Sequence, residues 1–205
     1  MAKLLYMTIT SLDGFIEDSE GDFGWGVPSP ELHQFFNDLQ RPIGTHLYGR
    51  RLYETMAVWE TMKLDESLAG LEEEAIDYQK LWRAAEKIVY STTLQETWTA
   101  RTKLENVFDV DAVRALKESA ETDLVIGGAA LASSAFAAGL IDEVHQTISP
   151  VILGAGKPAY SAQLTIDLEL LDHRRFESGA VHLHYKVKQR RELGAITTAE
   201  ELPTN

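Results

Sequence analysis

A short apolar run that ends in two glycines is the feature that most constrains the fold of this chain. Residues 123–126 are typical of a buried strand, and residues 129–136 continue with helical spacing after Gly127 and Gly128. Glycine lets the backbone approach a ligand closely, and the first amides of a helix attract anions. This stretch predicts a phosphate-binding corner at Gly127, Gly128, Ala129 and Ala130. The alternative is that the glycines only tighten a strand-to-helix turn.

Composition excludes several classes of function. The chain has 205 residues, 44% of them hydrophobic, which suits a single domain, and no cysteine, so it offers no disulfide or thiolate metal site. No segment approaches the ~18 apolar residues of a membrane span, and the amino terminus lacks a secretory signal, so we expect a cytoplasmic protein with no membrane partner. A net charge of -13, with 19 basic against 32 acidic residues, argues against nucleic-acid binding. An anionic cofactor must therefore meet local positive groups.

The spacing of apolar residues switches repeatedly between the period of a strand and that of a helix, which predicts an α/β fold. Strands are expected at residues 3–11, 45–49, 87–91, 123–126 and 143–149. Helices are expected to begin at Ser29-Pro30, at Arg50 and at Asp109. Residues 164–171 and 180–187 alternate as adjacent antiparallel strands. We expect one domain over residues 1–190, with a helical insertion near 60–85 and a loosely held tail at 191–205.

The order of several short motifs resembles the dihydrofolate reductase-like superfamily. These are residues 11–14 (Ser-Leu-Asp-Gly), Trp25, residues 30–32 (Pro-Glu-Leu), Gly49-Arg50, Tyr90-Ser91 and Gly127-Gly128, over residues 3–188. The match is closest to the bacterial branch related to the C-terminal reductase domain of the riboflavin-biosynthesis deaminase/reductase. The resemblance implies a three-layer sandwich, in which helices flank a mixed, mostly parallel sheet. It also implies NADPH across the carboxyl ends of the strands and hydride transfer to a C=N or C=O carbon.

Positions that match the motifs carry cofactor roles by resemblance. Gly49 and Arg50 resemble a second phosphate-binding corner, with Arg51 as the substitute, although Arg50 would also suit the start of a surface helix. Ser91 and Thr92 follow the third strand, where relatives hold the adenosine 2'-phosphate. Relatives often have an arginine beside that serine, whereas Thr92 offers only a hydroxyl, so the resemblance supports dinucleotide binding more firmly than a preference for NADPH.

Two carboxylates are candidate catalytic groups by resemblance. Glu31, at the start of the first long helix, corresponds to the acid that assists protonation in folate reductases, and Trp25, Leu32 and Phe35 would border the substrate. An ordinary first-turn glutamate, favoured by the helix dipole, is the alternative for Glu31. Asp13 lies in the loop over the nicotinamide and substrate of riboflavin-type reductases, and an Asp-Gly turn is the alternative for it. Trp25 would stack on a flat substrate or anchor its loop.

Two further patterns point less clearly to a functional site. Gly154-Ala-Gly156 is followed by Pro158, which blocks a helix, so it fits a loop near the substrate entrance, where Lys157 would meet an anionic substrate, or a subunit contact. His182 and His184 share one face of a strand, as metal ligands do. The sequence favours a surface pair on the more solvated face, and we expect no metal.

These observations predict an NADPH-dependent reductase whose small-molecule substrate is pterin-like or an aminopyrimidine of the riboflavin-precursor type. The resemblance also implies a homodimer. A non-catalytic nucleotide-binding protein on the same fold is the alternative. A kinase ranks last, because the chain lacks the Gly-x-x-x-x-Gly-Lys-Ser/Thr loop.

Overall fold

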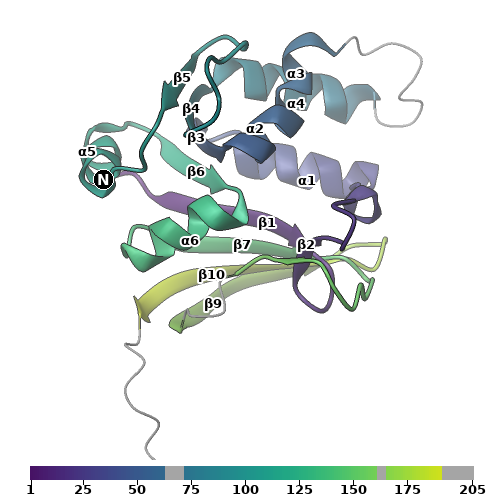
Figure 1. The fold of residues 1–205 in the computed structure, drawn as a ribbon. Coiled ribbons are helices and arrows are strands. Elements are labelled where there is room, and N and C mark those ends of the chain that lie inside the picture. The colour runs from purple at the N-terminus through teal and green to yellow at the C-terminus, as the bar shows by residue number, and fades with distance from the viewer. Residues whose placement is uncertain (63–71, 161–164, 191–205) are drawn as a thin grey trace, which may run out of the picture.

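One large sheet runs through the molecule in the computed structural model, which describes residues 1–62, 72–160 and 165–190 (Figure 1). Its eight strands lie in the order β5-β4-β3-β6-β1-β7-β10-β9. The first six of these are mutually parallel, whereas β10 runs antiparallel to both β7 and β9. The strands are β1 (Leu4–Thr10), β3 (Ile43–Gly49), β4 (Glu86–Tyr90), β5 (Thr102–Glu105), β6 (Asp123–Gly127), β7 (Glu143–Ile148), β9 (Ile166–Arg175) and β10 (Val181–Arg190).

Helices cover both faces of this sheet. They are α1 (Pro30–Gln40), α2 (Arg50–Met56), α3 (Val58–Thr61), α4 (Glu72–Ala84), α5 (Val110–Ser119) and α6 (Ala129–Ala137), with a 3-10 turn η1 at Gly24–Gly26. Figure 1 shows α5 and α6 on one side of the sheet and α1 and α4 on the other. A separate two-stranded ladder joins β2 (Phe15–Glu17) to β8 (Lys157–Pro158). This arrangement confirms the predicted α/β sandwich with a mostly parallel sheet and antiparallel carboxyl-terminal strands.

Alternate residues of each strand supply two separate cores. Leu4, Tyr6 and Ile126 face α5 and α6 and pack around Phe136. Their sequence neighbours Leu5 and Val125, which point the other way, pack with Ile43 on the opposite face. Because successive side chains in a strand alternate between faces, near-continuous apolar runs produce a sheet buried on both sides. The fold therefore leaves the ends of the strands as the place where a cleft can open.

The helices begin in two different ways. Ser29 caps α1 by accepting a hydrogen bond from the Leu32 amide, and Asp109 caps α5 through the amides of residues 111 and 112, as the sequence predicts. In contrast, α2 begins after Gly49 and α6 after Gly128, and neither helix has a side-chain cap. The unsatisfied first amides of α6 therefore remain available to a partner from outside the chain.

The structure adds strands that the sequence pattern did not reveal. β5 has four residues, two of them charged, and depends on pairing with β4, so it has no periodic signal of its own. β2 and β8 have three and two residues and are held by each other. The expected insertion near 60–85 is helical where described, at α3 and α4, while residues 63–71 and the expected tail at 191–205 lie outside the described residues. The domain limits stay a prediction.

The lengths of the helices can be compared with the prediction that no segment spans a membrane. Among the described residues, no helix combines the length and the apolar character that a bilayer span requires.

Candidate functional site

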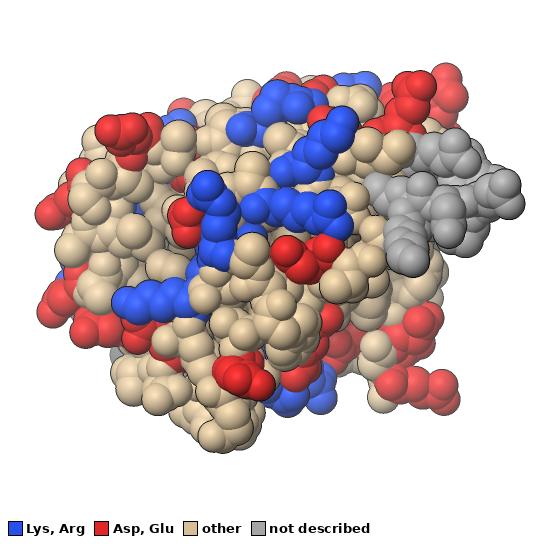
Figure 2. Space-filling view, turned by 90° about the horizontal axis from the view of Figure 1, so that it is seen from above, with Lys and Arg blue, Asp and Glu red and all other residues tan. Residues whose placement is uncertain are grey.

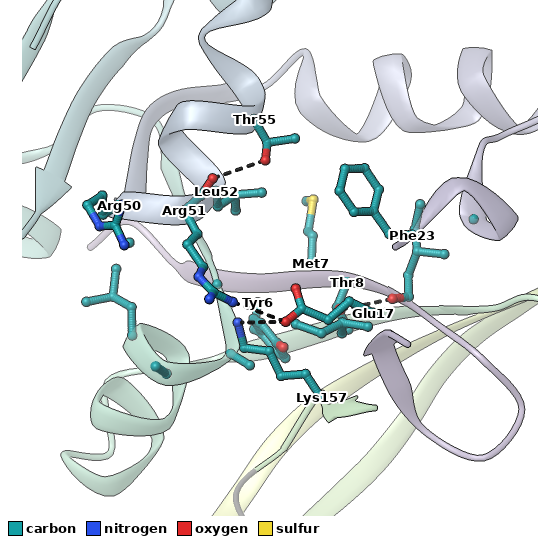
Figure 3. Close-up of a pocket in the computed structure, with 18 of the residues that line it drawn as sticks. Tyr6, Met7, Thr8, Glu17, Phe23, Arg50, Arg51, Leu52, Thr55 and Lys157 are labelled. Carbon is teal, nitrogen blue, oxygen red and sulfur yellow. Dashed lines mark hydrogen bonds and ion pairs between the residues drawn. The ribbon is translucent and has the colours of Figure 1, made fainter. Parts of the chain in front are cut away.

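A cleft of about 440 Å3 opens near the carboxyl ends of β1, β3 and β6. Residues 6–9 of β1 form its floor, and both glycine corners line it through Gly49 and Gly128. Figure 3 shows Arg50 at one end of the cleft and Phe23 at the other, with Arg51, Glu17 and Lys157 between them. Parallel strands that end side by side bring these distant segments together, and this is where α/β sheets bind ligands.

The two glycines at the end of β6 are required for different structural reasons. Gly128 has a φ of +95°, which side chains rarely allow, and a Cβ at this position would lie 3.8 Å from the Gly49 amide nitrogen. A Cβ on Gly127 would instead overlap the Leu52 side chain of α2. Gly127 therefore allows close packing between elements and does not line the cleft, whereas Gly128 does. The tight turn is present in this pair, and phosphate binding at Gly128 stays a prediction.

Positive groups gather where the first turns of α2 and α6 meet the cleft. Arg50 lines the cleft and pairs with Glu54 at 3.0 Å, and Ala129 and Ala130 line it from the uncapped start of α6. A guanidinium beside helix amides without a cap is the donor set that a diphosphate requires. In Figure 2 basic side chains gather near the middle of the face shown, although the net charge of the chain is -13.

A second groove adjoins the cleft at Arg50. It is lined by Arg50, Tyr90, Ser91, Thr92, Thr93 and Asn106. The Ser91 hydroxyl accepts hydrogen bonds from the Thr93 and Leu94 amides, at 3.2 and 3.0 Å, so it shapes the turn that follows β4. The structure therefore brings Arg50, Ser91 and Thr92 together, as the resemblance implies, and adds Asn106. Nothing in the sequence marked Asn106, because its position depends on β5.

Charged side chains meet at the middle of the cleft. Glu17 Oε1 accepts a hydrogen bond from Arg51 Nη1 at 3.3 Å and lies 3.6 Å from Lys157 Nζ. Glu17 and Lys157 are directly opposite each other in the β2–β8 ladder. Phe23 and Trp25 line the neighbouring end of the cleft. The sequence placed Lys157 near the entrance but did not single out Glu17, because only the ladder aims it inward.

Most other polar side chains of the cleft are bonded within the chain. The Tyr6 hydroxyl donates to the Ala159 carbonyl at 2.9 Å, and burial raises the pKa of Tyr6 to about 12. Thr55 donates to the Arg51 carbonyl at 3.0 Å, and Thr8 donates to the Ile9 carbonyl at 3.4 Å. The charged groups of Glu17, Arg51 and Lys157 are thus the main side-chain features available to a substrate.

The structure places the two carboxylates predicted as catalytic outside the cleft lining. Glu31 accepts from Arg174 Nη2 and from the Glu177 amide, each at 3.1 Å, and so joins α1 to the end of β9 and to the turn that follows it. Asp13 accepts from the Gly154 amide at 2.7 Å, and hydrogen bonds, first that of the Ser11 hydroxyl, lower the pKa of Asp13. Both carboxylates therefore act as hydrogen-bond acceptors that hold the chain together.

Only one of the three predicted substrate-binding residues lies at the cleft. Trp25 lines the cleft. Leu32 instead packs with Phe176 in a core beneath α1, and the Phe35 ring lies 4.8 Å from the His182 ring. Both α1 residues face the sheet, because helical spacing fixes one apolar face of α1 and the sheet covers it.

The expectation that His182 and His184 form a solvated surface pair is wrong for His182, which is buried. His182 Nε2 lies 3.2 Å from His145 Nδ1, and the His145 ring stacks on that of His184 at 4.0 Å. We call His145, His182 and His184 the histidine layer. The physical reason is α1, whose Phe35 covers this face of β7 and β10.

Glu143 brings a carboxylate to the same layer. Ligand atoms of Glu143, His145 and His184 lie within 4.8 Å of one another. However, Lys3 Nζ already pairs with Glu143 at 2.7 Å, and stacked imidazoles direct their lone pairs in parallel instead of towards one point. Burial, followed by the neighbouring histidines, lowers the pKa of His145 to about 3, and burial lowers that of His182 to about 4. His145 and His182 are therefore neutral near pH 7 and share a hydrogen bond, whereas His184 stacks on His145 and hydrogen-bonds to Glu143.

Known proteins match this chain over nearly its whole length. Residues 2–182 match the model of the RibD C-terminal domain. The curated Bacillus subtilis protein YyaP, described as uncharacterized, is 31% identical over 185 residues, which cover 89% of this chain and 94% of YyaP.

Solved structures show the same fold at lower identity. A putative riboflavin biosynthesis protein from Shewanella sp. PV-4 is 21% identical, with a TM-score of 0.71 over 92% of this chain and 100% of that one. Dihydrofolate reductase from Enterococcus faecalis is 15% identical, with a TM-score of 0.57 over 93% of this chain and 97% of that one. The chain therefore has the dihydrofolate reductase-like fold and belongs to the RibD C-terminal domain family.

Proposed function

We infer that this protein is an NADPH-dependent reductase that transfers hydride to a C=N or C=O carbon of a pterin-like or aminopyrimidine substrate. One observation carries the inference: Arg50 lines both the cleft with the two glycine corners and the groove with Ser91 and Thr92. An elongated dinucleotide with several phosphates requires this continuous path of positive and amide donors. Membership of a family with riboflavin-type reductase domains supports the same class of reaction.

The residues present fit the cofactor. The space above Gly128, which a Cβ would fill, admits a diphosphate close to the Gly49 and Ala129 backbone. Arg50, together with the hydroxyl of Thr92, would hold the adenosine phosphate in the side groove. When bound, NADPH supplies the hydride.

The rest of the cleft contributes position and exclusion of water. Phe23 and Trp25 offer flat apolar surfaces to an aromatic ring, and Ile9 and Ile16 add apolar side chains to the lining. The Tyr6 hydroxyl stays protonated and bonded to Ala159, so it holds the wall of the cleft. Such a site needs no nucleophile, because hydride transfer depends on alignment of two reactants, and water in the open cleft would supply the proton that the nitrogen or oxygen then takes up.

Coenzyme titration tests this function. Nicotinamide fluorescence should show NADPH binding that is tighter than NADH binding, and Arg50→Gln should weaken NADPH roughly tenfold or more, because a hydrogen bond to a charged group contributes about 1.5–3 kcal/mol. NADH should lose less affinity, because it lacks the 2'-phosphate. The matched control is Arg114→Gln on α5, where the guanidinium pairs only with Asp111 in the described structure.

Turnover separates the reductase from a non-catalytic binding protein. NADPH consumption should follow addition of ribosylaminopyrimidines or oxidised pterins. Tight NADPH binding with no consumption for either substrate class would favour the binding protein, and failure of both coenzymes to bind would contradict both functions.

A further inference from the structure

Glu17 is the one carboxylate among the residues that line the cleft in the described structure. Its side chain is 21% exposed, so it is neither buried in the core nor free in solvent. Both cations contact the same oxygen: Arg51 Nη1 and Lys157 Nζ lie 3.3 and 3.6 Å from Oε1. Within the described residues Oε2 accepts no hydrogen bond, so it is an available acceptor.

The backbone fixes where this carboxylate points. Glu17 ends β2 and lies opposite Lys157 of β8, and Asp13 ties the preceding loop to the Gly154 amide. A side chain at Gly156 would overlap the Glu17 carbonyl oxygen, so the two segments approach closely. The carboxylate is therefore held by a short ladder and a bonded loop, as a binding group must be to select a ligand.

The surroundings define what Oε2 accepts. Phe23 and Trp25 favour a flat ring, and the other side-chain hydroxyls of the cleft, on Tyr6, Thr8 and Thr55, already donate within the chain. A negatively charged acceptor beside flat apolar walls selects a heteroaromatic ring with N–H donors on one edge. Glu17 offsets one of the two positive charges of Arg51 and Lys157.

We propose that Glu17 is the specificity-determining residue of the substrate end of the cleft and binds the amino-substituted, N–H-donating edge of a pyrimidine or pterin ring. Arg51 and Lys157 are positioning residues that hold its other oxygen. The proposal rests on the proposed reductase function for its biological substrate, but the recognition step can be measured without NADPH. It moves the carboxylate that holds the substrate from α1, where the sequence placed it, to β2.

The experiment compares two rings of the same size with purified protein by isothermal titration calorimetry. 2,4-Diaminopyrimidine carries N–H donors, and 2,4-dimethoxypyrimidine carries none. The wild type should prefer the diamino ring roughly tenfold or more, because a hydrogen bond to a charged group contributes about 1.5–3 kcal/mol. Glu17→Gln should reduce that preference to roughly threefold or less, and Glu17→Asp, which keeps the charge, should retain part of it.

Controls separate recognition from folding and from the reductase function. Glu20→Gln, three residues along and exposed, should keep the full preference. Thermal denaturation should show Glu17→Gln folded, since Arg51 is 71% exposed and water can solvate it. NADPH titration of the same samples reports the proposed function separately, because a protein that fails to bind NADPH still gives the pyrimidine comparison.

Two results would overturn the proposal. One is a diamino preference that survives Glu17→Gln. The other is tighter binding of ribose 5-phosphate than of either pyrimidine, with loss of that binding in Lys157→Gln, which would show that the cations face an anionic substrate.

Discussion

The cleft and the histidine layer are two polar regions on one sheet, and they treat their polar groups in opposite ways. In the histidine layer, His182 bonds to both His145 and Thr147, at 3.2 and 3.0 Å. In the cleft, Glu17 Oε2 and the first amides of α6 have no side-chain hydrogen bond in the described structure. In these two regions, the bonded polar groups of the histidine layer contribute to the stability of the fold, whereas those left without a hydrogen bond in the cleft face a ligand.

The covering elements explain this difference. α1 lies across β7 and β10, and its Phe35 contacts His182 directly. Where β3 and β6 end, α2 and α6 begin beside the cleft and leave it open between them (Figure 3). Substitutions in the first region should therefore change stability alone, and those in the second should change binding alone.

The largest expected effect is acid destabilisation through the histidine layer. Burial keeps the folded-state pKa of His145 at about 3 and that of His182 at about 4, below the ordinary value of 6.5. As the pH falls below about 6.5, the unfolded chain binds protons before the folded one does, so stability falls until the folded pKa is reached. Each histidine should remove about 1.4 kcal/mol for each pH unit in that window.

Urea denaturation between pH 7.5 and 4.5 measures this slope. In the double variant His145→Gln, His182→Gln, the slope of the unfolding free energy against pH should be smaller than in the wild type by the equivalent of about two protons. NADPH affinity at pH 7.5 should stay the same. The titratable groups that face His145 and His182 are Lys3, Glu143, His184 and Asp172, and they are unchanged in this variant. Equal pH dependence of stability in the wild type and the double variant would show that the buried histidines do not control acid stability.

A smaller effect is expected at the capped start of α5. Asp109→Ala removes a side chain that accepts from the Asp111 and Ala112 amides, at 2.9 and 3.2 Å, and should lower the free energy of unfolding by about 1 kcal/mol. NADPH affinity should not change, in contrast to Arg50→Gln. Chemical denaturation and coenzyme titration of the same samples test both parts, and a loss of NADPH affinity would show that α5 belongs to the cleft.

The smallest effect is expected at Glu31. Glu31→Gln should lower stability by up to about 1 kcal/mol, since its partner Arg174 is half exposed, and should leave turnover unchanged. Steady-state kinetics with NADPH and a reducible pyrimidine measure this. A tenfold fall in turnover without loss of stability would restore Glu31 as the proton donor.

Much of the scaffold follows from local sequence signals. The strand-glycine-helix stretch at residues 123–136 and the caps at Ser29 and Asp109 each depend on neighbours within a few residues, so their patterns survive without tertiary information. The glycine turn at Gly128 is visible for the same reason. β5 was not, because a four-residue strand with two charges is stabilised only by β4.

The candidate site depends more on contacts between distant segments. Leu32 and Phe35 belong to an apolar face that the sequence identifies, but only the packing of α1 shows that this face covers β10 instead of the cleft. Glu17 and Lys157 are 140 residues apart and meet through one register of a two-stranded ladder. No periodicity within either segment encodes that register.

The sequence by itself determined the α/β class, the starts of the capped helices and the backbone corner after β6, because hydrophobic period, capping and glycine conformation act over a few residues. The tertiary structure alone decided which carboxylate faces the cleft and which histidines are buried. The physical reason is that strand order and helix packing assign each side chain to a face, and burial then determines whether a polar group is bonded inside the protein or left for a ligand.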